Sequence, residues 1–149
     1  MSISMRLNKL REIVSENNLD GFLVSSTENR RYFSGFSGSA GYLLVSQTEA
    51  VLGTDFRYVE QAGRQAHGYR IERLPVGYGW LPELSSQLGI EKVGFESQHM
   101  TVDSHSAFQK AIGTAKKGAD TALVEAPYSL DQIRAIKSGE EMSLLDRAI

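Results

Sequence analysis

The chain has 149 residues, of which 41% are hydrophobic and 23% charged, which suits one soluble domain with a single core. The net charge of −2 excludes a broad basic surface for nucleic acid, and the lack of cysteine excludes disulfides, thiolate metal sites and a cysteine nucleophile. No apolar stretch reaches the roughly 20 residues of a membrane span, so we expect a cytoplasmic protein without membrane or nucleic-acid partners.

Helical and strand patterns alternate along the chain. The first helix should end at Asn17 and Asn18, and its buried stripe consists of apolar residues at helical spacing: Ile3, Leu7, Leu10 and Val14. Short strands are expected at 21–26, 41–46, 50–55, 69–74, 92–96 and 121–126. The second and third strands flank a polar turn and should form an antiparallel hairpin.

Helix starts are predicted from capping residues. Ser25 and Glu28 have the spacing of a capping box, which should open a short helix through 29–33. Asp55 should cap the next helix and Thr101 a later one. The helix after Asp55 should bury one face formed by Val59, Ala62 and Ala66. A short helix further along carries Leu81, Leu84 and Leu88, and the helix after Thr101 carries Phe108, Ala111 and Ile112 on its inner side. Together the elements predict an α/β fold, a three-layer α/β/α domain with a mixed sheet of about six strands.

The end of the chain has two further helix signals. Ser129 should open a helical stretch that carries Leu130, Ile133 and Ile136. Ser138 and Glu141 repeat the capping-box spacing before a helix that stops at the last residue without glycine, proline or a basic final turn. This pattern favours a chain that ends within a longer protein; the alternative is a naturally frayed terminus.

Residues with metal-binding side chains are scattered along the sequence. His67, His99 and His105 lie in three different segments, and none has a second ligand at helical i, i+4 spacing. These histidines are best interpreted as surface or capping residues. A less favoured alternative is a nuclease-like acidic metal cluster made of Asp20, Glu28, Asp55 and Glu60. We therefore expect no metal site and no catalytic residue in this chain.

The most unusual segment is NRRYFSGFSGSAG, residues 29–41. It is not a phosphate-binding loop, because no lysine follows and the next element is a strand rather than a helix. No serine in it lies in a nucleophile elbow. Its glycines allow sharp turns and close approach to a partner molecule. Tyr32 and Phe33 should pack beneath the loop, whereas Phe36 is equally compatible with packing and with exposure at a binding surface.

A second candidate segment is GTDFRYVEQA, residues 53–62, where a strand turns into a helix. Ligands gather at strand ends in open α/β sheets, and Arg57 offers a planar donor fork suited to a carboxylate. The alternative is that Arg57 pairs with Glu60 or another acid and only fixes the corner.

Four blocks of the sequence carry a family resemblance, in order and spacing: NRRYFSGFSGSAGYLLVS, AVLGTDFRYVEQA, KVGFES and LDQIRAIKSGEEMSLLDRAI. Over essentially the whole chain they resemble the N-terminal domain of the creatinase, prolidase and aminopeptidase P family, which has a ribonuclease H-like shape. Phe56 departs from the glycine that many relatives have in a T-D-G-R-Y block. The resemblance implies a domain at 1–137, followed at 138–149 by the first helix of a C-terminal metallopeptidase domain.

What the resemblance implies for function is an accessory domain of an Xaa-Pro peptidase that is inactive alone. The catalytic domain would bind two divalent ions, Mn, Co or Zn, outside this chain. The implied partners are that catalytic domain, a second subunit in a homo-oligomer and a proline-containing peptide. The residues implied near the substrate mouth or subunit interface are Phe36, Ser37, Gly38 and Ser39, with Arg57 and Tyr58 as second candidates.

Three other functions stay open on the sequence. Relatives that lost catalysis use the same architecture as a non-catalytic peptide-binding or protein-binding module. The creatinase branch hydrolyses creatine without catalytic metals. A freestanding ribonuclease-H-like hydrolytic domain is the least favoured reading.

Overall fold

The computed structural model describes residues 1–115, 120–126 and 130–134. The described elements, in chain order, are α1 (Ile3–Glu16), β1 (Gly21–Val24), α2 (Thr27–Ser34), β2 (Tyr42–Ser46), β3 (Ala50–Thr54), α3 (Val59–Gln65), β4 (Arg70–Arg73), α4 (Trp80–Gln87), β5 (Lys92–Phe95), α5 (Val102–Gly113) and β6 (Ala122–Glu125). Residues 130–134 are also helical. The predicted helix start at Ser129, the position of Ile136 and the capping box of Ser138 and Glu141 lie outside the described residues.

The strands form one six-stranded sheet in the order β4-β3-β2-β1-β5-β6. Strand β2 is antiparallel to both neighbours, β1 and β3, whereas the pairs β3–β4, β1–β5 and β5–β6 are parallel. The hairpin predicted between 41–46 and 50–55 is therefore confirmed, and so is the mixed sheet of an α/β domain. Antiparallel pairing on the other side of β2 was not predicted.

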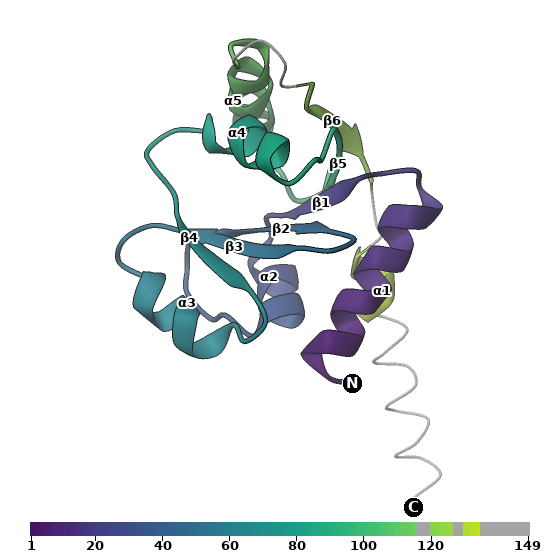
Figure 1. The fold of residues 1–149 in the computed structure, drawn as a ribbon, viewed down its shortest axis with the longest axis vertical. Helices are drawn as coiled ribbons and strands as arrows, with labels where there is room; N and C mark the ends of the chain where they lie inside the picture. Colours follow the sequence, from purple (N-terminus) through teal and green to yellow (C-terminus); the bar gives the residue numbers. More distant parts are fainter. Residues whose placement is uncertain (116–119, 127–129, 135–149) are drawn as a thin grey trace, which may run out of the picture.

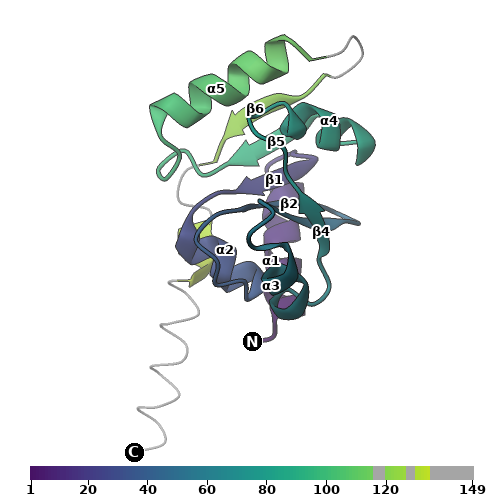
Figure 2. The ribbon, with the colours of Figure 1, turned by 90° about the vertical axis from the view of Figure 1, so that its left-hand side faces the viewer.

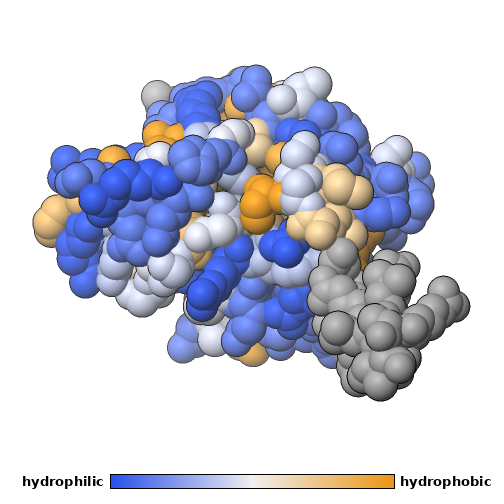
Figure 3. Space-filling view, turned by 90° about the horizontal axis from the view of Figure 1, so that it is seen from below, coloured by the Kyte–Doolittle hydropathy of each residue, from blue (hydrophilic) through white to orange (hydrophobic). Residues whose placement is uncertain are grey.

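Helices cover both faces of the sheet, as Figures 1 and 2 show: α1, α2 and α3 lie on one face, and α4 and α5 on the other. Strands β1, β2 and β3 are buried on both faces, which explains their continuous apolar sequences. Alternate residues of β1 show the division, because Phe22 and Val24 pack towards α1–α3 while Leu23 packs towards α4 and α5. The face of α1–α3 that Figure 3 shows from below is largely hydrophilic, with small apolar areas.

Two helix starts differ from the prediction. Helix α2 is capped by Ser26 rather than Ser25, because the Ser26 hydroxyl accepts the amide of Asn29 at 3.3 Å. Helix α3 has no side-chain cap: it begins after Tyr58, and Asp55 instead accepts the amide of Arg57 at 2.9 Å within the turn before the helix. The cap at Thr101 and the end of α1 at Asn17 are confirmed.

No helix in the described part of the chain is long and apolar enough to cross a membrane.

A polar network joins the end of β5 to α2 and to residues 130–134. The carboxylate of Glu96, which is 4% exposed, accepts the amides of Ser25 and Ser26 and the side-chain amide of Asn29. Asn29 also donates to Asp131 at 3.2 Å, and Nε2 of His99 lies 3.0 Å from the same carboxylate. Burial alone would raise the pKa of Asp131, but the hydrogen bonds from His99 and Asn29 outweigh it and lower the pKa below 3.8.

This depressed pKa predicts how Asp131→Asn changes acid stability. A carboxyl whose pKa is lower in the folded state stabilises the fold above its unfolded pKa and loses that contribution as the pH falls through the folded value. The wild type should therefore exceed Asp131→Asn in free energy of unfolding at pH 5, and the gap should shrink towards pH 3. Urea denaturation at both pH values measures it, with Glu60→Gln on the exposed face of α3 as the control. A gap that is unchanged at pH 3 would show that the charge of Asp131 has no part in it.

Candidate functional site: the glycine loop at the carboxyl edge of the sheet

Five of the six strands point in the same direction, because β2 alone is antiparallel to its neighbours. Their carboxyl ends therefore share one edge of the sheet, which we call the carboxyl edge. Strand β2 starts at this edge, so the glycine loop at 35–41 lies beside the loops that follow β1, β3, β4 and β5. In open α/β sheets this is the edge at which ligands bind.

The backbone of the glycine loop is held by side chains from neighbouring elements. The guanidinium of Arg30, on α2, donates from Nη2 to the carbonyl of Gly38 at 2.8 Å and from Nη1 to that of Gly41 at 3.0 Å. The hydroxyl of Thr54, at the end of β3, donates to the carbonyl of Ala40 at 2.7 Å. The carbonyl groups of Gly38, Ala40 and Gly41 are thus fixed in position, which is the property of a preorganised surface.

The outer side of the loop is tied to α3. Oε1 of Gln65 accepts the amide of Ser37 at 3.0 Å, and Nε2 of Gln61 donates to the Ser37 hydroxyl at 3.2 Å. The hydroxyls of Ser39 and Tyr58 lie 2.6 Å apart. Ser37 and Ser39 are nevertheless exposed, so a partner molecule can touch their side chains.

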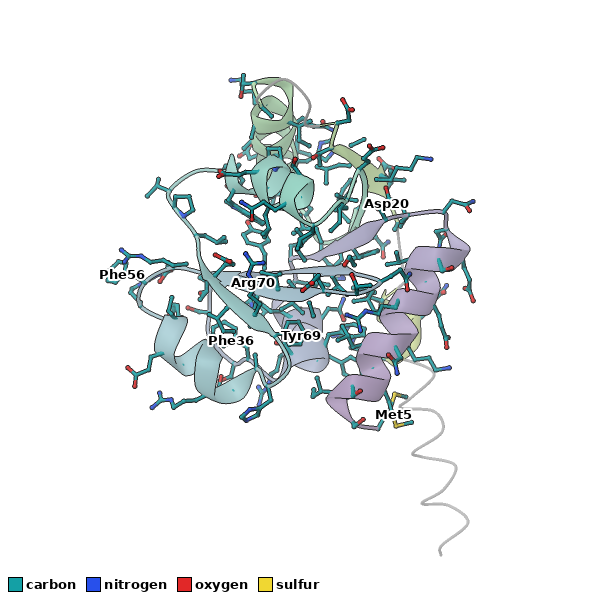
Figure 4. The ribbon with its side chains drawn as sticks, in the orientation of Figure 1. Met5, Asp20, Phe36, Phe56, Tyr69 and Arg70 are labelled. Carbon is teal, nitrogen blue, oxygen red and sulfur yellow. The ribbon has the colours of Figure 1, made fainter. Side chains whose placement is uncertain are left out.

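The ring of Phe36 lies inside the molecule and is 1% exposed, so the exposure that we considered for this residue is wrong for the described structure (Figure 4). It packs among the core residues of the α1–α3 face and meets the ring of Tyr58 edge-on, with centroids 6.1 Å apart. Gly38 lies against this ring, and a Cβ at that position would be 2.1 Å from Cζ of Phe36. Gly35 supplies the left-handed turn that ends α2, with φ of 81°.

The contact between Gly38 and Phe36 predicts the effect of Gly38→Ala. The new methyl group must displace the buried ring, so we expect a loss of about 1–2 kcal/mol in the free energy of unfolding. The control is Gly63→Ala, in α3, where a Cβ would meet nothing within 4 Å and where alanine favours the helix. Urea denaturation of both variants should give opposite signs, and equal stabilisation of both would contradict the tight packing of the loop.

The second predicted segment lies next to the loop, through Thr54 and Tyr58, but Arg57 points elsewhere. Its Nε and Nη2 donate to the two oxygens of Asp55 at 3.1 and 2.8 Å. This is the alternative that we considered for Arg57, with Asp55 in place of Glu60. The hydrogen bond from Arg57 lowers the pKa of Asp55. Phe56, between them, is 68% exposed and projects from the turn (Figure 4).

Burial is the main cause of the pKa shifts of two residues beneath the loop, Arg30 and Tyr42. Arg30 is 3% exposed, and burial lowers its pKa although Tyr42, Glu96 and Glu28 act in the opposite direction. Burial likewise raises the pKa of Tyr42, at the start of β2. Among the described residues, no carboxylate lies within ion-pair distance of Arg30, so neutral carbonyl oxygens alone accept its hydrogen bonds.

Sequence reasoning missed the side chains that hold the loop: Arg30, Thr54, Gln61 and Gln65. The two adjacent arginines at 30 and 31 were a visible signal, because helical geometry sends one inward and the other outward. In the structure Arg31 is exposed and Arg30 is buried. The glutamines gave no such signal, since they lie on an exposed face of α3 and meet the loop only in three dimensions.

No group of three or more His, Asp or Glu side chains that could hold a metal ion occurs among residues 1–115, 120–126 and 130–134. The acidic residues considered as a cluster have separate tasks: Asp20 accepts the amides of Glu91 and Lys92 at the start of β5, and Asp55 pairs with Arg57.

Comparison with known proteins agrees with this architecture. Residues 6–136 match the family model of the Creatinase/Prolidase N-terminal domain. The uncharacterized peptidase YqhT of Bacillus subtilis is 35% identical over 97% of this chain, and a probable Xaa-Pro aminopeptidase P of Paracoccidioides brasiliensis is 32% identical over 87%. The chain spans 39% of the first relative's length and 24% of the second's.

Solved structures show the same fold. An Xaa-Pro dipeptidase from Bacillus anthracis superposes with a TM-score of 0.79 at 33% identity, over 89% of this chain and 36% of that one. The N-terminal domain of the cytoplasmic peptidase PepQ from Mycobacterium tuberculosis H37Rv gives a TM-score of 0.77 at 37% identity, over 86% of this chain and 97% of that one. On its fold and its sequence, this chain belongs to the creatinase/prolidase N-terminal domain family.

Proposed function

We propose that this chain is the N-terminal accessory domain of a cytoplasmic Xaa-Pro peptidase. In this proposal residues 1–137 form the domain, and 138–149 begin a C-terminal catalytic domain that binds two divalent metal ions. Family membership supports it, as do relatives named as Xaa-Pro aminopeptidase and Xaa-Pro dipeptidase.

The observation that carries the proposed role is the prebuilt glycine loop at the carboxyl edge. Its backbone is fixed by Arg30 and Thr54, while Ser37 and Ser39 face outward. A fixed wall with small polar groups can border a peptide-binding mouth without a large entropic cost of ordering. Ser37, Gly38 and Ser39 are the residues proposed to border the substrate mouth, from this subunit or from a neighbour in a homo-oligomer. Phe36 supports them from below, and Arg57 and Tyr58 form the adjoining corner.

An activity assay tests the proposed function. The 149-residue chain with Mn²⁺ and a proline-containing peptide should give no hydrolysis above a metal-only control, because its described residues hold no metal centre. The polypeptide that joins this chain to the proposed catalytic domain should release the residue that precedes proline. Hydrolysis by the short chain would contradict the accessory role, and inactivity of the joined protein would favour a peptide-binding or protein-binding module.

Whether the glycine loop borders the substrate is tested with a variant of the joined protein, which contains this chain and the proposed catalytic domain. Ser39→Trp places a large side chain at an exposed site on the loop and should lower kcat/KM about tenfold or more, a change of about 1.4 kcal/mol. Ser86→Trp, exposed on α4, is the control and should leave kcat/KM unchanged. If both variants retain full activity, the loop does not border the substrate, even where the peptidase function itself holds.

A further inference from the structure

A pocket of about 310 Å³ opens at the carboxyl edge, between the glycine loop and the loop that leads into α5. Its walls come from three parts of the chain: the start of α2, the glycine loop at 39–41, and the first turn of α5 with the residues before it. It lies beyond the ends of the adjacent parallel strands β1 and β5. The volume lies at the lower end of the range for small-molecule sites, and is large enough for a molecule of dipeptide size.

Among the described residues, the lining of this pocket contains no aspartate or glutamate. Its basic side chains are Arg30 and His99, and His99 is paired with Asp131. The Arg30 guanidinium donates three hydrogen bonds, to the carbonyl oxygens of Gly38, Gly41 and, at 3.5 Å, Ser25. These carbonyl groups are neutral, so they satisfy the N–H groups of Arg30 without balancing its positive charge.

Glu96 is buried and acts to raise the pKa of Arg30, but its carboxylate is hydrogen-bonded to other groups. Both oxygens of Glu96 are used by the amides of Ser25 and Ser26 and by Asn29. A buried charge without an opposite charge in contact is costly, and a bound anion would remove part of that cost.

The remaining lining supplies hydroxyl donors and an apolar wall. The Ser25 hydroxyl is buried and has no hydrogen-bond partner within the described chain. Thr27, Ser104 and Tyr42 add further hydroxyls, and Phe108 and Met100 form the apolar part. Hydroxyl groups donate readily to carboxylate oxygens. A single buried guanidinium balances one negative charge, which suits a carboxylate better than a phosphate.

We propose that this pocket, which we call the Arg30 pocket, binds the carboxylate of a small organic molecule of about dipeptide size. Arg30 provides the charge, and the hydroxyls of Ser25 and Ser104 bind the carboxylate oxygens. The rest of the molecule lies against Met100 and Phe108. The carboxylate could belong to the C-terminus of a short peptide or to a simple organic acid. The site is formed by this chain alone and does not depend on the proposed peptidase function.

Three probes test the Arg30 pocket by NMR titration of the ¹⁵N-labelled 149-residue chain. N-acetylglycine carries a carboxylate beside an amide, propionate carries the carboxylate alone, and N-acetylglycinamide is the uncharged match of the first. N-acetylglycine should shift the amides of 39–42 and 100–104 with a Kd on the order of 1 mM, within the affinity available to so few atoms. N-acetylglycinamide should bind at least about tenfold more weakly. Equal shifts from propionate would identify a general organic-acid site, and a clear preference for N-acetylglycine would identify peptide C-termini.

Variants place the binding in the pocket. Ser104→Leu fills the pocket from α5, leaves Arg30 in the sequence, and should abolish the amide shifts. Ser106→Leu, on the exposed side of the same helix, should leave the amide shifts unchanged. Arg30→Gln removes the charge and should abolish binding too, and Ser104→Leu remains decisive if Arg30→Gln does not fold. Absence of shifts from both carboxylates, equal binding of N-acetylglycinamide, or full binding by Ser104→Leu would overturn the proposal.

Discussion

Phe36→Ala should lower the free energy of unfolding by about 3–5 kcal/mol, the usual cost of truncating a fully buried phenylalanine. The ring is 1% exposed and supports the loop from below, with Gly38 lying directly against it. Removing it creates a cavity between the loop and the α1–α3 face of the core. Urea denaturation of the 149-residue chain measures the change.

Phe56→Ala is the matched control for this experiment. Phe56 is a phenylalanine of the same carboxyl edge, but 68% of it is exposed, so its truncation should change stability by no more than about 0.5 kcal/mol. Comparable effects of the two substitutions would show that Phe36 is not a core residue. On sequence alone Phe36 was equally compatible with packing and with exposure at a binding surface; the structure buries the ring beneath the loop.

Arg30→Met should lower the free energy of unfolding by about 2–3 kcal/mol, because two carbonyl groups of the glycine loop lose their donor while methionine keeps most of the apolar volume. The two carbonyls belong to Gly38 and Gly41, at opposite ends of the outer part of the loop. The loss should therefore be accompanied by changed amide chemical shifts at 37–42, beyond any change in the central strands.

Arg57→Met is the control for the arginine. It removes an exposed ion pair with Asp55, a type of contact that contributes little to stability in water. Denaturation of the two variants, together with their amide spectra, separates a general loss of stability from a loss of loop structure. An Arg30→Met chain as stable as the wild type, with an unchanged loop spectrum, would mean that the guanidinium does not hold the loop.

The sequence predicted most of the fold because its local signals agree with one another. Apolar runs identified the six strands, and the cap at Thr101 located the start of α5. The wrong caps have a local cause: Ser25 and Ser26 are neighbours with the same chemistry, and only the bond between Ser26 and Asn29 distinguishes them. Asp55 does not cap α3 because it accepts hydrogen bonds from the amide and the guanidinium of Arg57, two residues away.

The candidate site was predictable only in part. Glycine spacing indicated the loop, and strand ends indicated the segment at 53–62, which the structure brings into contact through Ser39 and Tyr58. The inward direction of Arg30 and the contact of Gln65 with Ser37 depend on the packing of α2 and α3 around the sheet. Such contacts between distant segments have no signature in local residue patterns.

Backbone ¹⁵N relaxation of residues 36–41 tests most directly whether the glycine loop is a preorganised surface. The hydrogen bonds from Arg30, Thr54 and Gln65 predict order parameters near about 0.85, equal to those of β1 and β2. Values below about 0.6 across the loop would contradict the account, because a loop that moves freely on this timescale cannot be a wall held in place by its neighbours.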